Sequence, residues 1–140
     1  MFKTVLASVD VSVPEETRAL LKAAQEAAAG WGATLHVVTV VPDVGMAIVG
    51  AQLGQDFGER SRHAAQAELE RALADAGVEA EPHVLTGTVY DRVIRLADEL
   101  DVDLIMVGAH RPELKEYLLG TNAARLLRHS RKSVLVLRGN

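Results

Sequence analysis

Residues 103–138 read DLIMVGAHRPELKEYLLGTNAARLLRHSRKSVLVLR, and this stretch decides the fold. Its apolar run Leu104–Val107 predicts a strand that is buried on both faces of a parallel sheet. Gly108 ends the run, and after a polar loop a second glycine, Gly120, precedes the predicted helix Thr121–His129. These elements together predict a phosphate site, because the free N–H groups and the dipole of a helix's first turn favour an anion.

Short apolar runs alternate with segments of helical periodicity along the rest of the chain. The predicted strands are Thr4–Val9, Leu35–Val41, Glu81–Thr86, Leu104–Val107 and Val134–Leu137. The predicted helices run from Pro14 to Trp31, over Glu59–Ala76, from Thr88 through the stripe Val93, Ile94, Ala97 and Leu100, and over Thr121–His129. Strands that alternate with helices pair in parallel through right-handed crossovers. The sequence therefore predicts a single α/β domain over residues 1–140, an open doubly wound five-stranded sheet with helices on both faces.

Two helix starts carry capping signals. Ser12 with Glu15 three residues later predicts a capping box, and Thr88 with Asp91 predicts the start of the third helix. The segment Asp43–Gly58 contains four glycines among apolar residues and is predicted to be a long connection. Two interpretations of it stay open: a loop that covers the sheet or a dimer partner, and a lid over a ligand.

The composition excludes several classes of function. The 140 residues include no cysteine, which excludes disulfides, thiolate zinc sites and cysteine catalysis. A net charge of -4 argues against nucleic-acid binding, which needs a basic face. No stretch approaches the roughly 18–20 apolar residues of a membrane span, and the N-terminus lacks a signal peptide's cleavage region. We therefore expect a cytoplasmic protein without a membrane partner.

Asp10 ends the first predicted strand and is a candidate for ligand binding. A carboxylate at the carboxyl end of a buried strand accepts hydrogen bonds from adenine or ribose, but an aspartate also caps its own turn, and the residue alone leaves both roles open. Val40 and Val41 end the second strand and would supply an apolar wall for a base, or would belong only to the core. In open α/β sheets, ligands bind beyond the carboxyl ends of the strands, where the strand order reverses.

The predicted phosphate cradle follows the fourth strand. Its members are Gly108, His110, Arg111, Gly120, Thr121 and Asn122. A guanidinium binds phosphate oxygens as a bidentate fork, which favours Arg111 as a ligand, and the alternative is a solvated arginine paired with Glu113. His110 is either a phosphate or ribose ligand or an exposed loop histidine, and Gly120 alternatively serves only the turn before the helix.

Several known site patterns are absent from the sequence. There is no GxxxxGK[ST], no GxGxxG after the first strand and no GxSxG, which disfavours a P-loop, a dinucleotide cofactor and a hydrolase nucleophile elbow. The histidines are His36, His63, His83, His110 and His129, and their lack of helical ligand spacing argues against a dedicated metal site. Magnesium could still arrive with the phosphates of a nucleotide.

Five segments resemble the universal stress protein family. They are VLASVDVS at 5–12, TGTVYDRV at 86–93, GAHR at 108–111, LLGTN at 118–122 and SVLVLR at 133–138. The family's nucleotide signature is G-x2-G-x9-G-[ST], whereas here Arg111 stands at the second glycine and only Pro112–Leu119 precede Gly120. Ser8 stands where the family commonly has proline. The shortened loop resembles the branch of small stress proteins that contains F- and G-type members.

This resemblance implies a strand order of 3-2-1-4-5, which brings the ends of the first and fourth strands together. It implies binding of ATP or AMP, with Mg²⁺ carried by the phosphates. The implied nucleotide-binding residues are Ser8, Asp10, Val40, Val41, Val107, Gly108, His110, Arg111, Gly120, Thr121 and Asn122.

The resemblance also implies an assembly and a role. The assembly is a homodimer in which the final strands, Val134, Leu135, Val136 and Leu137 of each subunit, pair antiparallel. The role is that of a regulator in the stress response, with at most slow ATP hydrolysis and a protein partner that the sequence does not identify. Two alternatives stay open: a slow ATPase or phosphotransferase, and a dimerisation module of the same fold that works without nucleotide.

Overall fold

The computed structural model describes residues 1–42, 54–109 and 119–138. Its core is a five-stranded sheet in the order β3-β2-β1-β4-β5, in which all pairs are parallel. The strands are β1 Thr4–Ser8, β2 Thr34–Val41, β3 Glu81–Thr86, β4 Leu104–Gly108 and β5 Ser133–Leu137. The sheet confirms the predicted fold class and the strand order that the family resemblance implied.

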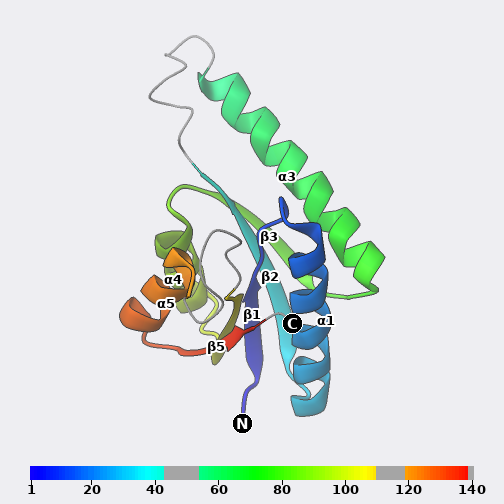
Figure 1. Cartoon of the computed structure of the whole chain (residues 1–140), viewed down its shortest axis with the longest axis vertical. Helices are drawn as coiled ribbons and strands as arrows, with labels where there is room; N and C mark the ends of the chain where they lie inside the picture. Colours follow the sequence, from blue (N-terminus) through cyan, green and yellow to red (C-terminus); the bar gives the residue numbers. More distant parts are fainter. Residues whose placement is uncertain (43–53, 110–118, 139–140) are drawn as a thin grey trace.

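Helices cover both faces of the sheet (Figure 1). They are α1 Pro14–Trp31, α3 Gly54–Ala76, α4 Val89–Glu99 and α5 Thr121–His129. Helices α1 and α3 lie on one face, and α4 and α5 lie on the other (Figure 1). Among the described helices, none has the length and apolar character needed to cross a membrane.

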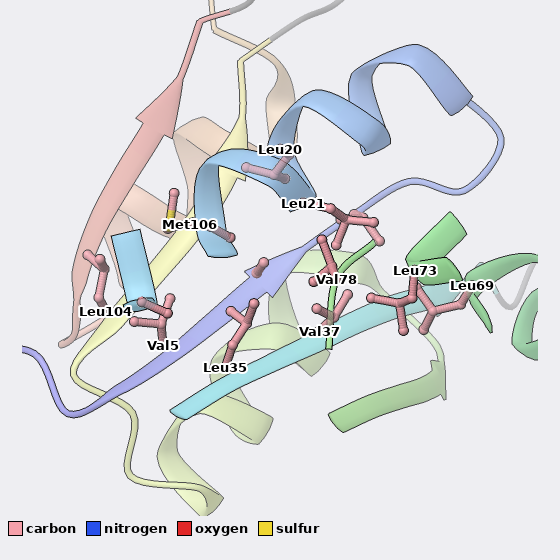
Figure 2. Close-up of a cluster of buried hydrophobic side chains, with 14 of the residues drawn as sticks. Val5, Leu20, Leu21, Leu35, Val37, Leu69, Leu73, Val78, Leu104 and Met106 are labelled. Atoms are coloured by element: carbon pink, nitrogen blue, oxygen red, sulfur yellow. The ribbon is translucent and has the colours of Figure 1, made fainter. Parts of the chain in front are cut away.

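Each face of the sheet has its own apolar core, because successive side chains of a strand point to opposite sides. On β1, Val5 and Ala7 face α1 and α3, whereas Leu6 faces α4 and α5. Figure 2 shows the first of these cores, where Leu69 and Leu73 of α3 lie near Val37 of β2. The two layers pack against opposite faces of the sheet and thereby position the carboxyl ends of its strands.

Helix α1 does not begin with the predicted capping box. The hydroxyl of Ser12 donates to Asp10 Oδ1 (2.6 Å), so it is not available to cap the helix. The N-cap is Val13, which makes no side-chain capping bond, and Pro14 takes the first helical position as predicted. At the other end, Trp31 is 40% exposed and packs against Phe2, so it does not belong to the buried stripe of the helix.

Helix α3 begins at Gly54, so the prediction of a loop over Asp43–Gly58 is wrong for residues 54–58. Residues 43–53 lie outside the described part of the chain, and both interpretations of them stay predictions. Glycine weakens a helix by only about 1 kcal/mol relative to alanine. Packing of Ala65, Leu69 and Leu73 against the sheet and α1 outweighs that preference over the helix as a whole.

Thr88 is the N-cap of α4, as predicted, but its side chain makes no capping hydrogen bond. The preceding Gly87 has a φ of 134°, which side chains rarely adopt, and its N–H donates to the carbonyl of Val41 (3.0 Å). This glycine therefore ties the start of α4 to the carboxyl end of β2. On the helix itself, Leu96 is buried with the predicted Val93 and Ala97.

Candidate functional site

The strand order reverses between β1 and β4. The chain runs outward from β1 to β2 and β3, and it then returns to place β4 on the other side of β1. A cavity of about 760 Å³ lies beyond the carboxyl ends of these strands. Ligand pockets commonly have volumes of about 300–1,000 Å³, and this position is where open α/β sheets bind ligands.

The end of β1 forms the first wall of the cavity. Ser8 is buried there, and Asp10 is exposed at the surface. Asp10 Oδ1 accepts hydrogen bonds from the backbone N–H (3.0 Å) and the hydroxyl (2.6 Å) of Ser12, while its carbonyl accepts one from Thr17 Oγ1 (2.6 Å). Asp10 thus caps its own turn, which is the structural role that the sequence left open beside ligand binding. Its exposure leaves the carboxylate accessible to a ligand as well.

The end of β2 supplies an apolar wall. Val40 and Val41 are half-buried and line the cavity, and Pro42 follows them at the surface. Their partial exposure distinguishes them from Val37 and Val38, which are fully buried in the two cores. Adenine is flat and largely apolar, so such a wall suits a base.

The third wall comes from β4 and the start of α5. Val107 is buried behind Gly108, and a Cβ added at Gly108 would lie 2.5 Å from Glu16 Oε1 of α1. Gly120 is the buried N-cap of α5, and both Gly120 and Asn122 line the cavity. The first turn of α5 has no acidic residue, and Arg128 and His129 lie in its last turn. This charge distribution leaves the partial positive charge of the helix start available to an anion.

The fold brings most of the predicted site residues to one cavity. Those that line it are Ser8, Asp10, Val40, Val41, Val107, Gly108, Gly120 and Asn122. Thr121 is exposed and is not among the residues that line it. His110 and Arg111 lie outside the described residues. The role of every one of these residues in binding stays a prediction.

Helices α1 and α3 also contribute to the cavity, and the sequence pattern did not predict this. Glu16 and Thr17 of α1, and Ser61, Ala64, Ala65 and Glu68 of α3, also line the cavity. The α3 residues follow the spacing of a single helix face, a signal that the sequence does contain. That spacing cannot reveal that the face borders the strand ends, because this depends on how α3 packs across β2 and β3.

The cavity is electrostatically divided. Asp10, Glu16 and Glu68 bring carboxylates to the sides formed by β1, α1 and α3. The start of α5 lies on another side and brings backbone amides without acidic side chains. An anionic group is therefore favoured at α5, whereas hydrogen-bond donors such as ribose hydroxyls are favoured at the carboxylates.

Comparisons with known proteins concern the sequence and the fold of the chain as a whole. A model of the universal stress protein family matches residues 1–138. Universal stress protein G of Escherichia coli O157:H7 is 30% identical over 144 residues, which cover 99% of this chain and 100% of that protein.

Solved structures share the fold. The hypothetical protein MJ0577 of Methanocaldococcus jannaschii matches with a TM-score of 0.77 at 22% identity, over 100% of this chain and 98% of that one. A universal stress protein crystallised in complex with cAMP matches with a TM-score of 0.64 at 27% identity, over 98% of this chain and 97% of that one.

Proposed function

This chain belongs to the universal stress protein family, and we propose that it binds an adenine nucleotide, ATP or AMP, in the cavity between β1, β4 and α5. In this proposal it acts as a cytoplasmic regulator in the stress response, and the bound nucleotide biases contacts with a protein partner. The observation that most supports this proposal is the composition of one cavity. The apolar wall of Val40 and Val41, the exposed carboxylate of Asp10 and the start of α5 meet there, where the strand order reverses.

The proposed pose follows from the chemistry of the three walls. The base lies against Val40 and Val41, and the ribose hydroxyls donate to Asp10. The phosphates lie at Gly120 and Asn122, where backbone N–H groups of the first turn of α5 point out of the helix end. A structural relative at 27% identity was crystallised with cAMP, an adenine nucleotide, which supports this class of ligand.

The acidic side of the cavity affects how a longer phosphate chain binds. A triphosphate that extends from α5 toward Gly108 meets Glu16, whose carboxylate lies against that glycine. Mg²⁺ is held by carboxylates together with nucleotide phosphates and would offset this repulsion. We therefore propose that ATP binds with Mg²⁺, whereas AMP binds without it.

The described walls hold little machinery for rapid hydrolysis. Among the described residues that line the cavity there is no histidine or lysine, so the carboxylates of Asp10, Glu16 and Glu68 are the available general bases, and in this proposal Asp10 is occupied by the ribose hydroxyls. We therefore propose that hydrolysis of ATP is at most slow and that nucleotide occupancy is the signal. A slow rate that falls in Asp10→Ala would establish a genuine activity, because a contaminating ATPase would not respond to this substitution.

Isothermal titration calorimetry tests the proposal. Mg²⁺-ATP, AMP and GTP are titrated into the wild type, Gly120→Trp and the matched control Gly30→Trp, because a Cβ at Gly30 of α1 would meet no atom of another element within 4 Å. We expect micromolar binding of the adenine nucleotides, lost by at least about tenfold in Gly120→Trp, since one charged hydrogen bond contributes roughly 1.5–3 kcal/mol. Wild-type protein that binds none of the three nucleotides would refute the proposal.

The alternative function, a nucleotide-independent dimerisation module, is favoured by β5. This strand lies at one end of the sheet order, and its Val134–Leu137 are half-buried within the described chain. We propose that two copies pair antiparallel through these edges in either function, because an apolar edge strand readily pairs with another chain. Dimerisation without nucleotide binding would favour the alternative.

The direction of the backbone groups in β5 shows where a substitution would disrupt dimerisation and leave the pairing with β4 intact. Leu137 accepts a hydrogen bond from the N–H of Ala109 (2.9 Å), so the backbone groups of Leu137 face inward and those of Val136 face the outer edge. Val136→Pro removes an outward donor without removing a bond to β4, and Val136→Thr keeps that donor. Size exclusion with light scattering should give a dimer for the wild type and Val136→Thr and a monomer for Val136→Pro. A monomeric wild type at micromolar concentration would refute the dimer.

A further inference from the structure

Two histidines and a glutamate gather at the amino ends of β2 and β3, away from the nucleotide cavity. His36 Nδ1 lies 3.0 Å from His83 Nε2 and 3.4 Å from Glu81 Oε2. One potential ligand atom from each residue lies within 4.8 Å of the others. Sequence analysis argued against a metal site because it considered only spacing within a helix, and this cluster lies on two strands.

Strand register assembles the cluster. His36 pairs with Glu81, and Val38 pairs with His83. Aligned residues of parallel strands share a face, and so do residues two apart, which places the three side chains together on the side of the sheet covered by α4. Val40 at the nucleotide cavity is four residues farther along β2, or roughly 13 Å away.

The distances agree with coordination of one ion. Zinc–nitrogen and zinc–oxygen bonds of about 2.0–2.2 Å place neighbouring ligands of a tetrahedron about 3.3–3.6 Å apart, and those of an octahedron about 2.8–3.1 Å apart. The His36–His83 separation of 3.0 Å lies in the octahedral range and the His36–Glu81 separation of 3.4 Å lies in the tetrahedral range, so each is within a few tenths of an ångström of either geometry. A small change in the histidine rings would replace their mutual hydrogen bond by two bonds to an ion.

The surroundings are also those of a metal site. The side chain of His36 is only 10% exposed, so packing restrains its position. The side chain of Glu81 is 66% exposed, so an ion can reach the cluster from solvent. The side chain of His83 is half-buried beside His36, so the sheet also restrains the second imidazole. Because β3 is an edge strand, water can complete the coordination sphere.

We propose that His36, Glu81 and His83 bind a divalent transition-metal ion. Imidazole nitrogens with one carboxylate suit zinc, iron, nickel and copper better than magnesium or calcium, which prefer oxygen ligands. The ion connects the edge strand β3 to β2 and so stabilises the sheet at its amino end. This site is independent of the proposed nucleotide cavity.

The test uses untagged, chelator-treated full-length protein with Zn²⁺ as the probe. Calorimetry is performed on the wild type, Glu81→Gln and His83→Asn, and on His63→Asn, which removes an exposed histidine of α3 as the matched control. Circular dichroism verifies the fold of each variant, and the more exposed ligands are chosen because His36 is buried. The melting temperature with and without Zn²⁺ provides a second readout.

We expect one Zn²⁺ per chain, with affinity reduced at least about tenfold in Glu81→Gln and His83→Asn, since loss of even an outer hydrogen-bond partner costs a metal site 10–100-fold. His63→Asn and Gly120→Trp should bind as the wild type does. Zn²⁺ should raise the melting temperature of the wild type and not of His83→Asn. Equal affinities in the wild type and both ligand variants would overturn the proposal, as would absence of binding by the wild type. The absorption spectrum of the Co²⁺ complex then distinguishes four ligands from six.

Discussion

The two ends of strand β1 each have an aspartate beside them, and the two carboxylates are used differently. At the amino end, Asp103 Oδ2 accepts hydrogen bonds from the backbone N–H groups of Lys3 (2.7 Å) and Thr4 (3.0 Å), residues about a hundred positions away in sequence. At the carboxyl end, Asp10 Oδ1 accepts its hydrogen bonds from Ser12, two positions away. Asp103 joins two strands, whereas Asp10 shapes a turn beside the cavity.

This difference extends to the surroundings. At the amino end, the backbone N–H of Asp103 also donates to the carbonyl of Thr4 (2.8 Å), so the starts of β1 and β4 are bonded to each other directly. At the carboxyl end, residues at and beyond the ends of the strands line a cavity of about 760 Å³. The amino end therefore supports folding, and the carboxyl end is available for binding. Three predictions test this division.

The largest expected effect is on the free energy of unfolding, when an apolar residue is shortened at the amino end of the strands and another at the carboxyl end. Leu104 begins β4 and is 3% exposed in the core, whereas Val40 lies half-buried against the cavity. We expect Leu104→Ala to lower the free energy of unfolding by about 2–5 kcal/mol. Val40→Ala should lower the free energy of unfolding by less than about 1.5 kcal/mol, because valine is smaller than leucine and Val40 is only partly buried in the wild type.

Urea denaturation followed by circular dichroism measures both free energies of unfolding. The same Val40→Ala variant should weaken AMP binding, which calorimetry detects, whereas Leu104→Ala should bind AMP normally while it is folded. Equal destabilisation by the two substitutions would break the division between the ends.

A smaller effect comes from the charge of Asp103. The hydrogen bonds from Lys3 and Thr4 lower the pKa of this carboxyl in the folded state. A lowered pKa stabilises the fold above the carboxyl's unfolded pKa of about 3.9, and this stabilisation is lost as the pH falls through the folded pKa. We expect Asp103→Asn to have a lower melting temperature than the wild type at pH 7.

The pH dependence of the melting temperature distinguishes an effect of the Asp103 charge from an effect of the side chain's shape. The difference in melting temperature between Asp103→Asn and the wild type should shrink below about pH 4, as the wild-type carboxyl also becomes neutral. Calorimetric scans from pH 7 to pH 3 measure it. A difference that stays constant over this range would mean that the carboxylate charge does not hold the strands together.

The smallest expected effect on folding is that of Asp10→Asn. The amide oxygen of asparagine can still accept from Ser12, and the site is exposed, so we expect the free energy of unfolding to change by less than about 1 kcal/mol. Affinity for AMP should nevertheless fall about tenfold, because a charged acceptor for the ribose is lost. Urea denaturation and calorimetry on one sample separate the two quantities. Strong destabilisation with unchanged affinity would make Asp10 a structural residue alone.

The sequence alone was sufficient for the elements that local pattern controls. The bounds of β3 and α5 agree with the predicted Glu81–Thr86 and Thr121–His129, because hydrophobic period and the flanking glycines mark them. The same local reasoning failed at Ser12, whose hydroxyl is bonded to Asp10 instead of capping α1. It failed again at Gly54, where α3 begins inside a glycine-containing segment that sequence patterns assign to a loop.

Tertiary structure alone decided which distant residues meet. Glu16 lies against Gly108 because α1 packs beside the end of β4, and Glu68 reaches the same cavity from α3. His36 and His83 are 47 positions apart and come within 3.0 Å through the register of β2 and β3. Periodicity indicates which face of a helix or strand is apolar, because this pattern is contained in the sequence of the element itself. Contacts between elements depend on packing and register, which are properties of the whole folded chain.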